Sequence, residues 1–177
     1  MIKMTAIAAA TVAALLATPA LAQDKPAISG YGAVGYSHVS VDPVSLGAIT
    51  GKLGGRGKYF GIEGEASFGV AGDDFLGVDV SLNHQLAAYA VGFLPIGPNH
   101  EGDLFARIGY GTGEIEGAAG GAAASVSDES INFGGGGQYF FKGGNHGMRA
   151  EYTRFEFNDG DGADVFSLSY VFRFGAQ

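Results

Sequence analysis

The stretch "FSLSYVFRF" at residues 166–174 alternates large apolar side chains with small or polar ones. Successive side chains of a β-strand point to opposite faces, so this period of two predicts a strand with two different faces. One face carries Phe166, Leu168, Tyr170, Phe172 and Phe174, and the other carries Ser167, Ser169, Val171 and Arg173. The fold depends on whether the aromatic face is the core of a soluble protein or the outside of a membrane protein.

The N-terminus has the composition of an export signal. Lys3 provides a positive charge, "AIAAATVAALLA" (6–17) an apolar run, and "ALA" (20–22) a small-residue cleavage site. The apolar run is shorter than the ~20 residues that a membrane-spanning helix needs. We therefore expect residues 1–22 to be a cleaved signal peptide, the alternative being a retained N-terminal helix. Residues 23–177 are expected to form one domain.

The composition limits the classes of function. The chain has 18 Asp and Glu, 10 Lys and Arg, and no cysteine. Without Lys3 it would carry nine basic residues against 18 acidic ones, a net charge of −9. Such an acidic surface repels nucleic acid, so we expect no nucleic-acid partner. The lack of cysteine excludes disulfides, a thiolate nucleophile and a Cys-ligated metal.

Segments with period-two alternation recur along the chain after the signal, whereas no long stretch has a 3.6-residue apolar period. The predicted strands are residues 28–41, 47–57, 60–71, 78–94, 103–114, 129–141, 147–157 and 164–174. The connections alternate in character. Those at 57–59, 95–102 and 142–147 are tight or rich in Gly and Pro, and those at 42–47, 71–77, 114–128 and 158–163 are mostly longer or acidic. This alternation predicts an up-and-down meander with one short-turn end and one loop end.

The two faces allow two arrangements. With the apolar face inside, as in a soluble lipocalin-like barrel, glycine and alanine at the strand centres would fill the core poorly. With that face outside in lipid, aromatic residues gather in two belts at the membrane interfaces. We place Tyr59, Phe60, Phe93, Tyr139, Phe141, Phe172 and Phe174 in the short-turn belt, and Tyr36, Phe68, Tyr110, Phe133, Phe155 and Phe166 in the loop-end belt. The sequence thus predicts an all-β fold, an eight-stranded antiparallel up-and-down transmembrane β-barrel.

The polar faces of the strands then line the barrel interior. Because unpaired buried charge is costly, we expect the inward ionic groups to form a hydrogen-bonded network. Its members are Lys52, Arg56, Glu63, Glu65, Arg107, Arg149, Glu151 and Arg173. Side chains can fill the space inside eight strands, so a continuous aqueous pore is not expected. The run "GGGG" (134–137) is interpreted either as backbone covered by neighbouring aromatics or as a bulge or bend.

The export signal, the eight amphipathic strands and the terminal "SLSYVFRF" together resemble the small OmpA-type and OmpX-like outer-membrane β-barrels, over residues 28–174. The resemblance implies short periplasmic turns, external loops, and contact with outer-membrane lipid and lipopolysaccharide. It also implies that Tyr170, Phe172 and Phe174 form the signal for the barrel-assembly machinery. The sequence departs from the family where Ser169 replaces a common glycine and where three residues follow Phe174. No peptidoglycan-binding domain is expected, and the barrel is expected to be a monomer.

Residues capable of catalysis or metal binding are few. His38 and Ser40 share one face of the first strand, with Asp42 next in line. Because no strong oxyanion-hole donor accompanies them, we expect no enzyme activity. His84, His100 and His146 lack metal-ligand spacing, and Asp159, Asp161 and Asp164 are interpreted as a solvated acidic loop or a weak calcium site.

The expected function is therefore a structural or surface-interaction role that uses no cofactor and no metal. The small-residue segment 116–127 is the expected region of contact with an external partner, whose identity the sequence does not give. The alternatives are a small porin-like channel, a lipid A-modifying enzyme and a soluble periplasmic ligand-binding barrel.

Overall fold

The computed structural model describes residues 28–41, 44–75, 78–98, 101–119, 122–157 and 162–174. The predicted signal peptide lies outside these described residues. The strands are β1 (Ser29–Val41), β2 (Val44–Arg56), β3 (Phe60–Ala71), β4 (Asp73–Phe75), β5 (Val78–Ile96), β6 (Gly102–Ala119), β7 (Ala122–Phe140), β8 (His146–Phe157) and β9 (Gly162–Phe174). A 3₁₀ turn, η1 (Phe141–Gly143), joins β7 to β8. Within the described residues, no helix has the length and apolarity required to cross a membrane.

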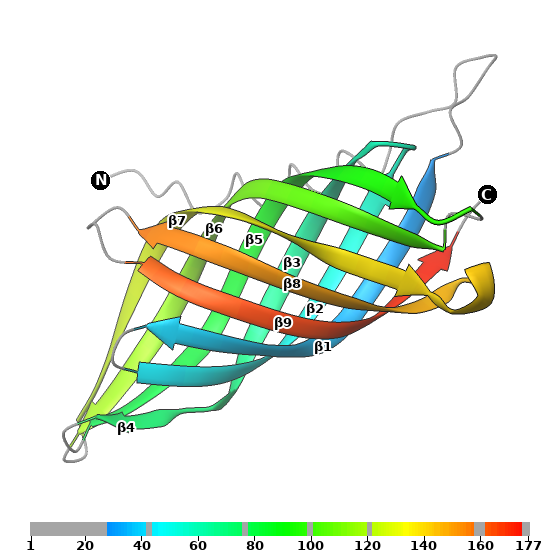
Figure 1. Ribbon diagram of the computed structural model, residues 1–177. Helices are drawn as coiled ribbons and strands as arrows, with labels where there is room; N and C mark the ends of the chain where they lie inside the picture. Colours follow the sequence, from blue (N-terminus) through cyan, green and yellow to red (C-terminus); the bar gives the residue numbers. More distant parts are fainter. Residues whose placement is uncertain are drawn as a thin grey trace.

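The strands form one closed antiparallel barrel (Figure 1). The strands pair in chain order except that β3 pairs with β5 rather than with β4, and β1 pairs with β9, which closes the wall. The three-residue β4 pairs with the start of β5, beyond the part of β5 that pairs with β3. The wall therefore has eight strands, and the predicted eight-stranded up-and-down barrel is confirmed.

The aromatic face of the last strand points outward. Phe166 is 58% exposed and Leu168 is 52% exposed, whereas the intervening Ser167 and Ser169 are each only 2% exposed. The same arrangement holds around the barrel. Large apolar side chains are exposed on the outer face, and the buried charged side chains point inward. A soluble barrel would have the opposite arrangement, because it needs a polar outer face.

Two aromatic residues lie on the opposite face from their prediction. Phe93 and Phe155 were placed in the outer belts, but they are 5% and 4% exposed and point inward. The alternation of β8 explains Phe155, because it is in phase with the inward Arg149 and Glu151. In β5 both faces are apolar around Phe93, so the sequence pattern did not distinguish them. The other predicted belt residues are exposed on the outside.

The four consecutive glycines lie where β7 approaches β8 closely. The register of β7 is continuous with both neighbours, so there is no bulge in this stretch. A Cβ added at Gly136 would lie 2.2 Å from the carbonyl oxygen of Ala150, and one at Gly134 would lie 2.2 Å from that of Tyr152. Close strand approach therefore explains these two glycines. Aromatic cover occurs elsewhere, as where the Tyr31 ring lies over Gly54.

Candidate functional site

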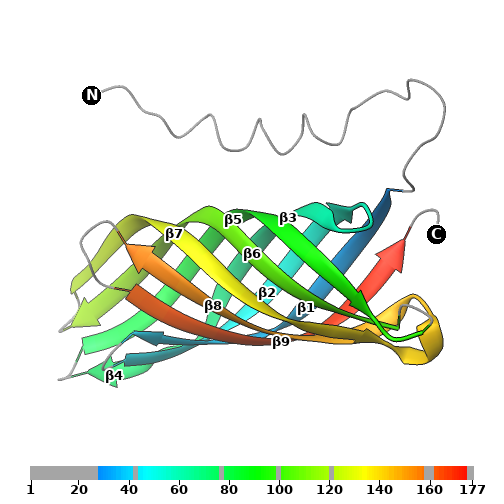
Figure 2. The ribbon, with the colours of Figure 1, turned by 45° about the horizontal axis from the view of Figure 1, so that its top comes forward.

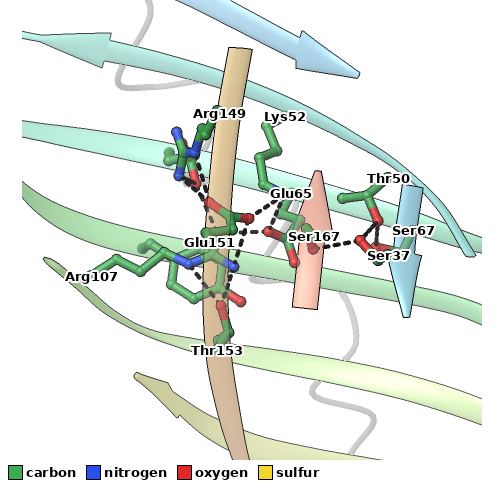
Figure 3. A network of polar contacts seen from close by, with 12 residues as sticks. Ser37, Thr50, Lys52, Glu65, Ser67, Arg107, Arg149, Glu151, Thr153 and Ser167 are labelled. Carbon is green, nitrogen blue, oxygen red and sulfur yellow. Dashed lines mark hydrogen bonds and ion pairs between the residues drawn. The ribbon is translucent and has the colours of Figure 1, made fainter. Parts of the chain in front are cut away.

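The barrel interior is the largest constellation of polar side chains in the described structure, and at its centre lies a network of six charged residues (Figure 3). Period-two alternation places Glu63 and Glu65 on the inner face of β3, and Arg149 and Glu151 on the inner face of β8. Lys52 from β2 and Arg107 from β6 complete the network. With three positive and three negative groups, the network is electrically balanced.

Short ion pairs join these groups across the lumen. In the closed wall, β3 and β8 lie opposite each other, so the pair between Arg149 Nη1 and Glu63 Oε2, at 2.6 Å, crosses the barrel. Arg107 Nη1 contacts Glu63 at 2.9 Å and Glu65 at 2.7 Å. Every charged side chain of the network is at most 4% exposed. These contacts connect opposite walls through buried, charge-assisted bonds.

Lys52 forms two further ion pairs in the network, and neutral hydroxyl groups form hydrogen bonds with other members. Lys52 Nζ lies 2.6 Å from Glu151 Oε1 and 3.2 Å from Glu65 Oε2. Arg149 Nη2 contacts Glu151 Oε2 at 2.7 Å. The Tyr31 hydroxyl donates to Glu63 at 2.7 Å, and Arg107 Nη2 donates to the Thr153 hydroxyl at 2.6 Å.

A second, smaller cluster surrounds Asp103 near the short-turn end. Arg56 donates to both carboxylate oxygens of Asp103, at 2.7 and 3.0 Å. Gln138 donates to Asp103 at 2.8 Å, and Arg173 donates to it at 3.1 Å. The structure thus divides the eight charged residues named from the sequence into a central six and the pair Arg56 and Arg173. Asp103 was not among the predicted residues, although it begins a predicted strand in phase with the inward Phe105 and Arg107, so the alternation of β6 was a signal that could have found it.

Aromatic rings separate the two clusters. The apolar layer at the short-turn side consists of Tyr31, Ala33, Tyr89, Val91, Phe93, Phe105, Phe140 and Val171. Guanidinium groups stack on its rings, with Arg149 at 4.1 Å from the Phe105 centroid and Arg56 at 4.0 Å from the Phe93 centroid. Such cation–π contacts attract the guanidinium groups to the rings, so that an ionic layer can lie directly against an apolar one.

Hydroxyl groups and a second apolar layer fill the interior toward the loop end. Ser37 on β1 is hydrogen-bonded to Thr50 on β2 at 2.6 Å and to Ser167 on β9 at 2.7 Å, and Thr50 continues the row to Ser67 on β3 at 2.8 Å. Beyond this row lie Val39, Leu46, Ala48, Leu82, Phe155, Ala163 and Val165. From the short-turn end, the described interior is therefore layered as the Asp103 cluster, the first apolar layer, the central ionic network, the hydroxyl row and the second apolar layer.

The three residues of the predicted assembly signal lie together on the outer face of β9 at the short-turn end. The Phe172 and Phe174 rings are stacked at 6.3 Å. His146, the first residue of β8, lies 4.9 Å from the Phe172 ring, and its Nδ1 is hydrogen-bonded to the Tyr170 hydroxyl. His146 thus begins a strand and contributes to the aromatic belt.

The sequence matches the model of the outer membrane protein beta-barrel domain family over residues 8–174. The chain belongs to this family. As an outer-membrane barrel, the protein resides in the cell outer membrane, with its apolar outer face in lipid. No match to a curated protein sequence was found.

The fold of this outer-membrane barrel is similar to that of several solved barrels. Ail, the attachment invasion locus protein of Yersinia pestis, has 18% identity and a TM-score of 0.62, over 85% of this chain and 100% of that one. The N-terminal barrel of Pseudomonas aeruginosa OprF has 13% identity and a TM-score of 0.62, over 82% and 97%. Neisserial surface protein A has 12% identity and a TM-score of 0.59, over 84% and 97%. At these low sequence identities, the similarity shows a shared fold only.

The outer-membrane barrel carries His38 and Ser40 on its outward face. His38 is exposed on β1, and Ser40 lies opposite Asp164 of β9. Among the described residues, no hydrogen bond joins His38 to Ser40 or either of them to Asp164. The Asp164 carboxylate is engaged by the Tyr152 hydroxyl at 2.5 Å and by Arg154 at 3.0 Å. Asp159 and Asp161 of the predicted acidic loop lie outside the described residues, as do Asp42 and His100.

Proposed function

We propose that this outer-membrane barrel is a non-enzymatic, closed protein that stabilises the membrane and presents loops and strand extensions outside the cell. The layered interior is the observation that carries the proposal. Two apolar layers enclose the ionic and hydroxyl layers, so an ion crossing the lumen would have to displace packed side chains. By the general architecture of outer-membrane barrels, the short-turn end would face the periplasm and the loop end the exterior.

The central network supports a structural role. Charge buried in a closed lumen is tolerated when it is paired and hydrogen-bonded, and removal of one partner is strongly destabilising. A network whose ion pairs cross from β3 to β8 holds opposite walls at a fixed separation. These contacts favour a rigid barrel over one that opens to conduct.

The test is conductance of the folded full-length protein in planar lipid bilayers. The proposal expects no regular conductance steps above the leak of the bilayer. Reproducible steps whose size changes in an Arg149→Gln variant would show that the lumen conducts and would favour the porin-like channel. Steps that are identical for both proteins would belong to a contaminant.

The enzyme alternative is tested by mass spectrometry of lipid A from cells that overexpress the protein. The proposal expects the same lipid A masses for the wild type and the Ser40→Ala variant. A new lipid A species that disappears in Ser40→Ala would contradict it. The absence of a hydrogen bond between His38 and Ser40 in the described structure supports the non-enzymatic role.

We further propose that the protein contacts lipopolysaccharide and outer-membrane lipid through its outer face, acts as a monomer, and is inserted by the barrel-assembly machinery through Tyr170, Phe172 and Phe174. The exposure of these three aromatic side chains at one end of β9 supports the last point. In the folded barrel Tyr170 and Phe172 also pack against His146, a contact that the unfolded strand lacks.

A further inference from the structure

The Asp103 cluster lies at the short-turn end of the lumen, where β9 ends and η1 joins β7 to β8 (Figure 2). Arg56 and Arg173 both donate to Asp103, so two positive side chains share one negative side chain. The central ionic network, by contrast, is electrically balanced. Within the described residues, the Asp103 cluster therefore carries one positive charge in excess.

Arg56 is the main counterion of Asp103. Its Nη1 and Nη2 donate to the two carboxylate oxygens at 2.7 and 3.0 Å, which is the two-pronged geometry of a strong guanidinium–carboxylate pair. Its Nε donates to the carbonyl oxygen of Gly57 at 3.3 Å. All three nitrogen atoms of Arg56 are therefore engaged, and the excess charge belongs to Arg173.

The Arg173 guanidinium has donors to spare. Its Nη2 donates to Asp103 Oδ2 at 3.1 Å, and that oxygen also accepts from Arg56 and from Gln138. Within the described part of the chain, no other group accepts a hydrogen bond from this guanidinium, and Nε is buried without a partner. The guanidinium lies over the Phe140 ring, 3.2 Å from its centroid. The side chain is 18% exposed, so solvent reaches it from the short-turn end.

Gln138 adds an acceptor that also lacks a partner. The side chain is 5% exposed, and its Nε2 donates to Asp103 Oδ2 at 2.8 Å. Because an ionised carboxylate only accepts hydrogen bonds, the atom of Gln138 next to it must be the nitrogen. Oε1 is then a buried acceptor with no partner among the described residues. A donor of Arg173 and an acceptor of Gln138 thus remain unsatisfied beside the same carboxylate, and buried groups of this kind usually have a partner.

The surroundings of the cluster favour negative charge. Lys58 and Lys142 are exposed at the same end of the barrel. With the two arginines they make four positive side chains, against the carboxylates of Asp103 and Glu101 in the described residues of this end. The resulting positive potential raises the local concentration of anions.

The unsatisfied atoms restrict the kind of anion. A ligand must be negative, must accept from Arg173 and must donate to Gln138. A carboxylate or a sulfate only accepts, and water has no charge. A phosphate group that retains one proton satisfies all three conditions, whereas a phosphodiester has lost the P–OH donor.

We propose that Arg173 and Gln138 bind a singly protonated phosphate group, from inorganic phosphate or a phosphomonoester, at the short-turn end of the lumen. Arg173 Nε–H donates to a phosphate oxygen, and the P–OH group donates to Gln138 Oε1. In the orientation proposed above, the site faces the periplasm. Its chemistry depends neither on that orientation nor on whether the lumen conducts, so its test is separate from the conductance test.

The test is a titration of the ¹⁵N-labelled full chain, folded in a maltoside detergent that contains no phosphate. The arginine Nε–Hε signals are followed by NMR at about pH 6, where a phosphomonoester retains its second proton in about half of the molecules. The signal of Arg173 is identified by its loss in Arg173→Lys. At constant ionic strength, inorganic phosphate should shift it saturably and leave the signal of Arg154 on the outer face unchanged.

Related anions define the ligand. Sulfate and dimethyl phosphate lack the P–OH donor and should bind at least ~10-fold more weakly, because a site built for a hydrogen bond rejects the analogue that cannot form it. Glycerol 3-phosphate distinguishes the sources. Its binding would show that the site accepts a phosphomonoester, and binding of inorganic phosphate alone would restrict the site to the free anion.

Two glutamine variants, compared by titration calorimetry, test the acceptor. Gln138→Met removes Oε1 at similar volume and should weaken phosphate binding at least ~10-fold. Gln85→Met, which changes an inward glutamine beside Glu65 in the central network, should bind phosphate as the wild type does. A heat-modifiable gel band establishes that each variant is folded. Absence of a saturable Arg173 shift, equal affinity for sulfate, or unchanged binding by folded Gln138→Met would each overturn the proposal.

Discussion

Replacement of Arg149 by methionine removes one of the three cations of the central ionic network. Arg149 is fully buried, donates to Glu63 and Glu151, and stacks on Phe105. Methionine preserves most of the volume, so the main loss is the positive charge. The network would then hold three carboxylates against Lys52 and Arg107.

The magnitude follows from the unpaired charge. Breaking a buried ion pair by removal of one partner costs about 3–5 kcal/mol, because the remaining charge is desolvated without compensation. With a urea dependence of about 1–3 kcal/mol per molar, the unfolding midpoint should fall by roughly 2 M. Unfolding in lipid vesicles can be followed by circular dichroism and by the gel shift on boiling, since the chain has no tryptophan.

A second substitution separates charge balance from packing. Arg149→Met combined with Glu63→Gln restores neutrality and should recover part of the loss, with a coupling energy of about 1–3 kcal/mol. Arg154→Met removes an arginine of the outer face, whose ion pairs are solvent-accessible, and should leave the midpoint nearly unchanged. If Arg149→Met were tolerated as well as Arg154→Met, the network would contribute little to stability and our reasoning would be wrong.

Three further predictions concern the wall. Gly136→Ala should destabilise the barrel by about 1–3 kcal/mol because its Cβ meets the Ala150 carbonyl, whereas Gly137→Ala, with its nearest atom at 3.6 Å, should be tolerated in the same unfolding assay. Leu168→Arg should cost about 2–4 kcal/mol on the lipid face, and Thr112→Arg, nearer the loop end, much less; equal costs would contradict the membrane placement. Phe172→Ala should reduce the heat-modifiable band in isolated outer membranes while unfolded protein accumulates, and an undiminished band would remove this residue from the assembly signal.

Alternation was sufficient to predict the barrel from the sequence. In β9 the contrast between Phe166 and Ser167 divides the side chains into two faces in only one way. The apolar face was assigned to lipid because glycine and alanine at the strand centres would fill a core poorly. Where both faces of a strand are apolar, as around Phe93, the pattern carries no direction. The inward position of Phe93 became clear only from its packing against Tyr31 and Phe105.

The interior was less accessible to sequence reasoning. The alternation of side chains along a strand indicates which ones face the lumen. It does not give their height along the barrel axis, because that height depends on the stagger between neighbouring strands. The separation of Arg56 and Arg173 from the central six residues results from that stagger, as does their shared contact with Asp103. The length of β6 and β7 was equally out of reach, since the sequence predicted a loop at residues 114–128 where the two strands pair as far as Ala119 and Ala122.

The charge balance of the central network has a consequence for how the chain can be divided. Lys52 and Arg107 neutralise Glu63 and Glu65 within β2 to β6, and Arg149 and Glu151 of β8 neutralise each other. A fragment that ends after β6 and a fragment that begins with β7 would each contribute an electrically neutral set to the central network. A split between β6 and β7 therefore divides the protein into two pieces suited to reconstitution by mixing, because each piece brings a neutral share of the central network, and Arg173 of the second piece then regains its counterion Asp103 from the first.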